Sequence, residues 1–202
     1  MTLSEFLNAT DYYERDPKAF ADRYDSVTFE AVHPHVLPYL PSSGRVLDVG
    51  AGSGRDARFV ASCGLKVTAV EPSAGLRSLG ARNSGGVIWI DDRLPDLESI
   101  AEKAERFDLI LCSAVLMLVT PTDLTKSFAT LGELLVPAGK LAINLRAPLP
   151  DEPPGIFFDH SDNDVLAAAE AAGFKCLHRG EAKDALGRSG YNWRSFIFEH
   201  SI

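Results

Sequence analysis

The segment VLDVGAGSGR, residues 46–55, decides the fold of this chain. Its apolar start predicts a buried strand over 45–50, and the residues after it predict a helix over 56–63. Three glycines lie between the two elements: Gly50, Gly52 and Gly54. Glycine lets the backbone turn tightly and lets a ligand come close, because it has no Cβ. This is the setting of a nucleotide-binding turn, although a tight turn with no ligand has the same pattern.

The spacing of the glycines separates two kinds of cofactor. A dinucleotide-binding turn has the spacing GxGxxG, which would require a glycine where this chain has Arg55. Asp48 stands two residues before the first glycine, where its charge would repel a pyrophosphate. An acidic side chain there suits a positively charged or amine-bearing ligand. The pattern therefore disfavours a nicotinamide-dependent oxidoreductase.

Short apolar runs alternate with helical patterns along the rest of the chain. Strands are expected over 66–70, 87–91, 107–112, 140–145, 174–178 and 191–199. Helices are expected over 29–39, 73–82, 97–105, 121–135 and 161–172, the last begun by a capping box of Ser161 and Asp164. Alternation of this kind indicates parallel βαβ units, and the final two strands, joined by a loop, should be antiparallel. We expect an α/β, doubly wound, seven-stranded sheet, mostly parallel with one antiparallel strand near the C-terminus and helices on both faces.

Length and composition indicate one domain over residues 1–202. A chain of 202 residues with 46% apolar and 24% charged residues is ordinary for a globular protein. Its net charge of −8 disfavours nucleic acid as a partner. The longest apolar run, residues 109–119, is too short for a membrane span, and the first residues lack the pattern of a signal peptide. The three cysteines, Cys63, Cys112 and Cys176, form no metal or redox motif and are expected to be buried and reduced, in a cytoplasmic protein.

With these motifs in order, the chain resembles the class I S-adenosylmethionine-dependent methyltransferases of the small, single-domain type, from about residue 10 onward. The resemblance implies a Rossmann-like fold and S-adenosyl-L-methionine as cofactor. It assigns Asp48 and the three glycines to the amino acid end of the cofactor, and Glu71 to the ribose hydroxyls. It assigns Asp91, or Asp92 in the alternative register, to the adenine. The other expected cofactor-binding residues are Tyr24, Ala51, Arg55, Pro72, Ser113 and Ala114. Residues 1–40 are expected to form a helical cover over the cofactor.

The chain departs from the family pattern in two places. Many members have a histidine in the segment after the fourth strand, where this chain has Leu118. The usual PGG before the fifth strand is PAG here, and Ala138 should be tolerated if the position does not require a positive φ. If that histidine assists catalysis in the relatives, this chain lacks its contribution.

Acceptor-binding residues are sought at the carboxyl edge of the sheet, where ligands bind in open α/β folds. We expect Tyr12, Tyr13, Arg146 and Trp193 there. Arg146 and His160 are weak catalytic candidates, because a surface salt bridge and a solvated loop histidine explain them as well. His33 and His35, flanking a proline, are taken as an exposed helix end, and no metal site is expected.

The sequence thus predicts S-adenosylmethionine-dependent methyl transfer to a small-molecule acceptor by in-line displacement. The protein should work as a monomer or homodimer, without nucleic acid or membrane. One alternative is a catalytically silent protein that binds the cofactor as a sensor or partner. The other, less favoured, is an NAD-dependent oxidoreductase.

Gly52→Val is predicted to abolish cofactor binding, because the side chain would fill the space that a ligand needs at the glycine turn. Calorimetric titration with S-adenosylhomocysteine measures the binding, and circular dichroism checks that the variant is folded. A folded variant with unchanged affinity would show that the ligand does not lie against this turn.

Overall fold

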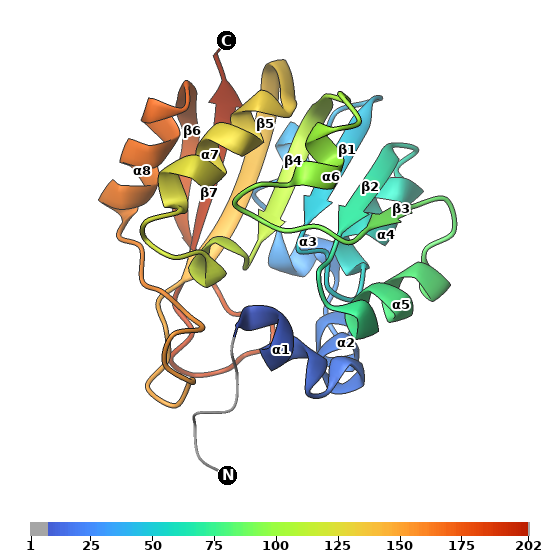
Figure 1. The fold of residues 1–202 in the computed structure, drawn as a ribbon, viewed down its shortest axis with the longest axis vertical. Helices are drawn as coiled ribbons and strands as arrows, with labels where there is room; N and C mark the ends of the chain where they lie inside the picture. Colours follow the sequence, from blue (N-terminus) through green and yellow to red (C-terminus); the bar gives the residue numbers. More distant parts are fainter. Residues whose placement is uncertain (1–7, 202) are drawn as a thin grey trace.

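The computed structural model describes residues 8–201, and its centre is a seven-stranded sheet in the order β3-β2-β1-β4-β5-β7-β6 (Figure 1). The strands are β1 Arg45–Val49, β2 Lys66–Val70, β3 Ile88–Ile90, β4 Phe107–Ser113, β5 Leu135–Arg146, β6 Phe174–Ala182 and β7 Trp193–His200. The pairs from β3 through β5 are parallel, and β7 is antiparallel to both β5 and β6. The predicted mixed sheet with its reversed strand near the C-terminus is confirmed.

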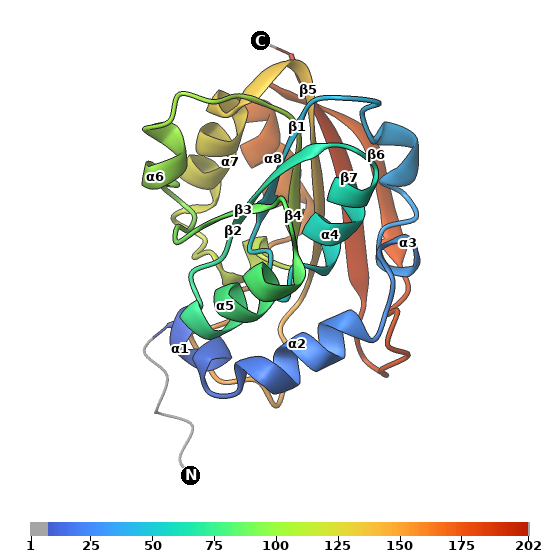
Figure 2. The same ribbon diagram turned by 90° about the vertical axis from the view of Figure 1, so that its right-hand side faces the viewer.

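Helices cover both faces of the sheet (Figure 2). On one face lie α3 Phe29–Val32 and α4 Arg55–Ser62, and on the other lie α6 Glu98–Ala101, α7 Leu124–Glu133 and α8 Asp162–Ala171. Helix α5, Ala74–Asn83, packs against β3, where Gly80 allows the Trp89 ring to come close. The two short N-terminal helices, α1 Ala9–Glu14 and α2 Pro17–Asp25, lie beyond the carboxyl ends of the parallel strands. Two 3-10 turns, η1 Leu37–Tyr39 and η2 Leu116–Leu118, complete the elements.

A large hydrophobic core fills the space between the sheet and helices α6 to α8. The rings of Phe128, Phe174 and Phe198 meet edge to face there, with centroids 5.9 to 6.1 Å apart. These contacts join α7 to the two C-terminal strands, so the reversed strand belongs to the same core as the parallel half of the sheet.

The predicted helix over 29–39 is wrong. The structure has α3 at Phe29–Val32 and a separate 3-10 turn at Leu37–Tyr39. Pro34 lacks an N–H and disfavours helical backbone at the residue before it, and His33 accordingly leaves the helical region with φ −124° and ψ 45°. His33 is also buried, not exposed as expected. The capping box of Ser161 and Asp164 at the start of α8 is confirmed.

The structure differs from two further expectations, which concern the cysteines and Ala138. Cys112 is buried as expected, but Cys63 and Cys176 are exposed, because they lie at the end of a helix and on the edge strand β6. Ala138 has φ +62°, so the position where the family pattern has glycine does require left-handed backbone. A left-handed conformation costs a non-glycine residue about 1–2 kcal/mol. Within residues 8–201, no helix has the length and apolar character needed to cross a membrane.

Leu131→Ala is expected to lower the free energy of unfolding by about 2–5 kcal/mol, because Leu131 is fully buried in the main core on α7. Leu37→Ala is the matched control, since Leu37 is exposed and should change stability by less than about 0.5 kcal/mol. Urea denaturation of both variants measures the difference. Equal effects would contradict the assignment of the core.

Candidate active site

A cavity of about 370 Å³ opens at the carboxyl ends of the parallel strands. It lies where the strand order changes direction, between β1 and β4, which is the usual ligand-binding position in open α/β sheets. The segments after β1, β2, β3, β4 and β5 line it, and residues of α1 and α2 line it from beyond the strand ends (Figure 1). The cavity therefore has two halves: the glycine turn and the end of β2 on one side, and the ends of β4 and β5 on the other.

The glycine turn supplies a wall without side chains. Gly50 has φ +68°, and a Cβ there would lie 2.3 Å from Val115 Cγ2. Gly52 has φ +56° and faces the ring of Tyr24, which an added Cβ would approach to 3.4 Å. Both positions require glycine, the first for space and both for backbone conformation. The turn leaves its backbone open to a ligand.

Glu71, just after β2, is the acidic group that faces this turn. It is buried, and its two carboxylate oxygens accept hydrogen bonds from Gly52 N and Ser73 N, each at 2.8 Å. Burial raises the pKa of Glu71 to about 7, although the two N–H donors act in the opposite direction. Each oxygen keeps a further lone pair, so the carboxylate can also accept from the vicinal hydroxyls of a ribose.

Asp48 lies behind the turn and not among the described residues that line the cavity. It is buried, its Oδ2 has no hydrogen-bond partner in the described part of the chain, and burial next to Asp56 holds its pKa well above the usual value. Asp56 does line the cavity. Its carboxylate contacts His33 Nε2 at 2.9 Å and accepts from Arg55 Nε at 2.6 Å. Burial alone would raise the pKa of Asp56, but these two partners outweigh it and hold the pKa well below its usual range.

Asp91 and Asp92 lie in different surroundings, although they are neighbours in the sequence. Asp91 is exposed and forms an ion pair with Arg77 at 2.9 Å, outside the residues that line the cavity. Asp92 lines the cavity, and its carboxylate accepts from the backbone N–H groups of Arg93 and Ile100. The register alternative is therefore the one in position to meet a ligand.

Two carboxylates fasten the N-terminal helices over the cavity. Glu14, at the end of α1, accepts from Ser73 Oγ and Gly75 N, both at 2.9 Å, at the start of α5. Asp25, at the end of α2, accepts from Ser53 Oγ and Arg58, both at 2.6 Å. Both contacts reach turns that follow parallel strands, so the cover is attached to the sheet edge itself.

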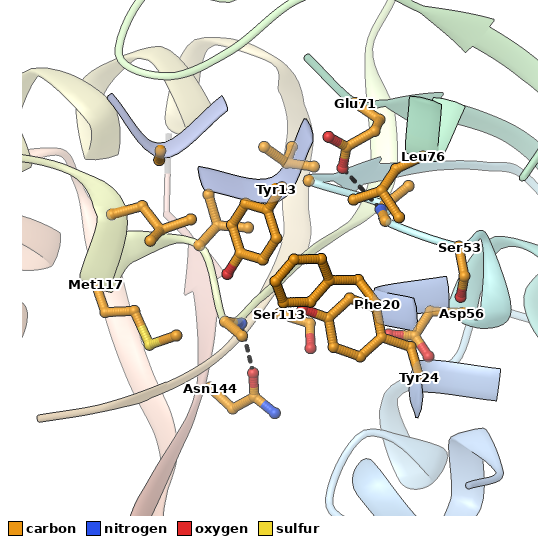
Figure 3. A pocket seen from close by; sticks show the side chains of 18 of the residues that line it. Tyr13, Phe20, Tyr24, Ser53, Asp56, Glu71, Leu76, Ser113, Met117 and Asn144 are labelled. Carbon is orange, nitrogen blue, oxygen red and sulfur yellow. Dashed lines mark hydrogen bonds between the residues drawn. The ribbon is translucent and has the colours of Figure 1, made fainter. Parts of the chain in front are cut away.

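Three aromatic side chains of the cover point into the cavity. Tyr13, Phe20 and Tyr24 lie between Glu71 on one side and Met117 and Asn144 on the other in the view of Figure 3. Burial raises the pKa of Tyr24 to about 12. Burial is also the main reason that the pKa of Tyr13 is raised. Both hydroxyls are thus neutral hydrogen-bonding groups at neutral pH.

The other end of the cavity is built around a buried arginine. Arg146, the last residue of β5, is only 4% exposed and forms an ion pair with Glu152. Its guanidinium carbon lies 4.9 to 5.8 Å from the ring centroids of Phe157, Tyr191 and Trp193. This is a desolvated ion pair inside an aromatic enclosure and not the surface salt bridge considered from the sequence.

His160 is also buried, not solvated, but it does not line the cavity. Its Nε2 lies 3.0 Å from the carbonyl oxygens of both Leu116 and Val119. Carbonyl oxygens only accept, so Nε2 carries a hydrogen and donates to them. The ring holds η2 in place and is not among the described residues that line the cavity.

Most of the residues expected from the sequence are brought together at this cavity. Those that line it are Tyr12, Tyr13, Tyr24, Gly50, Ala51, Gly52, Arg55, Glu71, Pro72, Asp92, Ser113, Ala114, Arg146 and Trp193. Asp48, Gly54, Asp91 and His160 are not among the described lining residues. Gly54 instead makes room for the Trp89 ring, 2.8 Å from where its Cβ would lie. Leu118, where many relatives have histidine, lines the cavity as an apolar group.

Sequence reasoning missed several lining residues. Asn144 interrupts the apolar run of β5, and this break in pattern was a usable signal. Asp56 directly follows Arg55 and was assigned only to a helix. Residues 182–191 enter the cavity from the loop between β6 and β7, where the sequence offers no periodicity to place them.

The affinity for S-adenosylhomocysteine is expected to fall about tenfold between about pH 8 and about pH 6, as Glu71 takes up a proton. A raised pKa means that the carboxyl is mostly neutral below pH 7 in the free protein, and a neutral carboxyl loses acceptor capacity. Calorimetry at the two pH values measures the change. Glu71→Gln is the control and should bind more weakly with little pH dependence; a wild type without pH dependence would show that protonation of Glu71 does not control binding in this range.

Comparison with known proteins agrees with this geometry. A family model described as "Methyltransferase domain" matches residues 22–179. Ubiquinone biosynthesis O-methyltransferase of Xanthomonas axonopodis pv. citri (strain 306) is 33% identical over 122 residues, covering 56% of this chain and 50% of that protein. The enzyme of the same name from Agrobacterium fabrum (strain C58) is 39% identical over 83 residues, covering 40% and 32%. This chain spans half or less of the length of both relatives.

Solved structures share the whole fold at low identity. The N-methyltransferase NodS from Bradyrhizobium japonicum WM9, in complex with S-adenosyl-L-homocysteine, superposes with a TM-score of 0.73 at 17% identity, covering 96% of this chain and 98% of that one. The 1,6-didemethyltoxoflavin-N1-methyltransferase of Burkholderia thailandensis gives a TM-score of 0.69 at 20% identity, covering 98% and 93%. With the family model spanning most of its length, the chain belongs to the class I S-adenosylmethionine-dependent methyltransferases.

Proposed function

We propose that this protein transfers a methyl group from S-adenosylmethionine to a small molecule bound at the ends of β4 and β5. The single observation that carries the proposal is the two-part cavity. Its turn side fits the cofactor, since a bare glycine backbone and the Glu71 carboxylate face it. Its other side is enclosed by aromatic and apolar groups, as small-molecule sites usually are.

The residues of this chain have separate tasks in that reaction. Glu71 binds the ribose hydroxyls, Asp92 faces the adenine, and Gly52 leaves room for the cofactor's amino acid end. The cofactor supplies an activated methyl group, and the protein supplies orientation. Tyr13 and Tyr24 form the wall between the two halves, and the cover that carries them excludes water. Arg146 and Trp193 shape the acceptor end.

A small acceptor is favoured over a macromolecule by the enclosure of the site. The acceptor end lies beneath the cover and between the 147–160 and 183–192 loops, so a nucleic acid strand or protein loop would have to displace them. The overall charge of −8 also disfavours nucleic acid. Some of the relatives are named for ubiquinone biosynthesis, a small-molecule pathway.

A cofactor-binding protein without catalysis is the second candidate, and one observation favours it. His160 faces two carbonyl oxygens, and Leu118 places an apolar side chain in the cavity, so neither position supplies a base. Methyl transfer does not require a base when the acceptor is already nucleophilic, which keeps the enzyme as the first proposal.

Incubation of the protein with methyl-labelled S-adenosylmethionine and cell extract is expected to place label in the low-molecular-weight fraction. Extract separated into small molecules, protein and nucleic acid identifies the acceptor class. Gly52→Val is the control and should transfer no label. Label in protein or nucleic acid would contradict the small-molecule acceptor. Tight binding of S-adenosylhomocysteine with no transfer to any fraction would favour the silent binder.

A further inference from the structure

The carboxylates that line the cavity are all engaged by other groups of the protein. Asp56 contacts His33 and Arg55, and Glu71 accepts from two backbone N–H groups. Asp92 also accepts from two backbone N–H groups. The remaining two are held by arginines, Glu152 by Arg146 and Asp184 by Arg188, and Asp184 also accepts from Trp193 Nε1 at 3.0 Å. Each carboxylate that lines the cavity among the described residues is thus already paired with a donor of the protein itself.

Uncommitted groups in the same cavity are hydrogen-bond donors. Asn144 lies at the end of β5, and its Oδ1 accepts from Ala114 N at 2.8 Å (Figure 3). A backbone N–H can only donate, so the amide oxygen must face it and the NH₂ group points elsewhere. That NH₂ group has no hydrogen-bond partner within residues 8–201. Its nitrogen is not among the fully buried polar atoms that lack a partner. The hydroxyl groups of Tyr13 and Tyr24 line the same cavity and stay protonated, because burial raises the pKa of both side chains.

The charged side chains that line the cavity also favour a negatively charged ligand. Six cationic and five acidic side chains line the cavity, in a chain whose net charge is −8. Lys183, at the acceptor end, has no acidic partner within the described residues. A site with a free amide donor and a free cation, whose carboxylates are paired with other groups of the protein, is complementary to an oxyanion.

We propose that the methyl acceptor is an oxygen acid, such as an acidic phenol, an enol or a carboxylic acid, that enters the cavity already ionised and is held by the Asn144 amide. The proposal rests on the function proposed above. The acceptor's oxyanion donates a lone pair to the methyl carbon and forms the new C–O bond. The C–S bond of the sulfonium breaks, and sulfur keeps its electron pair. No proton is transferred, so no base is needed, and the neutral ether or ester leaves with S-adenosylhomocysteine.

The apolar walls suit a planar body behind the charged oxygen. Met117 and Phe157 line the cavity and belong to a buried apolar cluster, against which Tyr12 and Trp193, also lining residues, are packed. The Tyr12 and Phe157 rings meet edge to face with centroids 5.4 Å apart. Such walls bind an aromatic ring by burial of apolar surface, and the donors at the strand ends then orient its oxygen.

Ring-substituted phenols of graded acidity test the proposal, with para-nitrophenol and phenol as the end members and benzoate as the carboxylate probe. At one pH and with the cofactor saturating, kcat/KM is expected to rise with the ionised fraction of the probe, and para-nitroaniline is expected not to react. In calorimetry with S-adenosylhomocysteine present, para-nitrophenol should bind at least tenfold more tightly than phenol. Binding of none of the acidic probes, or methylation of the aniline alone, would overturn the inference.

Asn144→Asp tests the residue. The new carboxylate can still accept from Ala114 N, but it replaces the NH₂ donor with a negative oxygen. We expect kcat/KM for para-nitrophenol to fall at least tenfold while S-adenosylhomocysteine affinity is unchanged. Asn163→Asp is the matched control, because it adds the same charge at an exposed position in the first turn of α8. Loss of S-adenosylhomocysteine affinity in Asn144→Asp would assign the amide to the cofactor and overturn its proposed role.

The wild-type acceptor series keeps the inference testable if Asn144→Asp does not fold. The same experiments separate failure of the inference from failure of the proposed function. Transfer to amines alone leaves a small-molecule methyltransferase with a different acceptor. Binding of S-adenosylhomocysteine without transfer to any probe or extract fraction would contradict the proposed methyltransferase activity.

Discussion

The buried carboxylate of Glu71 links the two turns on which the site depends. One oxygen accepts from Gly52 N after β1 and the other from Ser73 N after β2. A single side chain therefore holds the two strand-to-helix turns at a fixed separation from each other. Arg77 Nη1 donates to the Glu71 carbonyl oxygen at 2.6 Å and fixes the backbone of the same residue. Because a buried carboxylate must be hydrogen-bonded, these turns cannot move apart without leaving a charge unpaired.

The N-terminal cover depends on the same two turns. Ser53 and Ser73 follow β1 and β2, and each donates its hydroxyl to a carboxylate at the end of a cover helix, Asp25 and Glu14. The position of the cover is therefore set by the turns at the sheet edge. Its tyrosines lie between the glycine-turn side of the cavity and the side formed by the ends of β4 and β5. The shape of the cavity thus follows from the geometry of the sheet edge.

The acceptor half shows how tertiary structure changes the meaning of charged residues. Arg146 and Asp184 are 38 positions apart in sequence, yet both meet Trp193: the ring centroid lies 5.8 Å from the guanidinium carbon, and Nε1 donates to the carboxylate. From the sequence Arg146 reads equally well as a surface residue, because a charged side chain after a strand is usually solvated. In the folded chain it is instead buried among aromatic rings at the wall of the cavity. The same effect removes His160 from the site, since its ring nitrogen is committed to two backbone carbonyls.

The sequence by itself determined the sheet, the glycine turn and the acidic residue after β2. These follow from local chemistry: apolar runs of strand length, glycine where the backbone is left-handed, and strict alternation of strands and helices. Only the tertiary structure placed Asp92 on the cavity and Asp91 outside it, placed Asp48 behind the turn, and brought Asn144 and residues 182–191 into one cavity. A shift of one residue at a strand end reverses the direction of a side chain, and loops carry no periodicity. Those assignments depend on contacts between segments far apart in the chain, which no local pattern records.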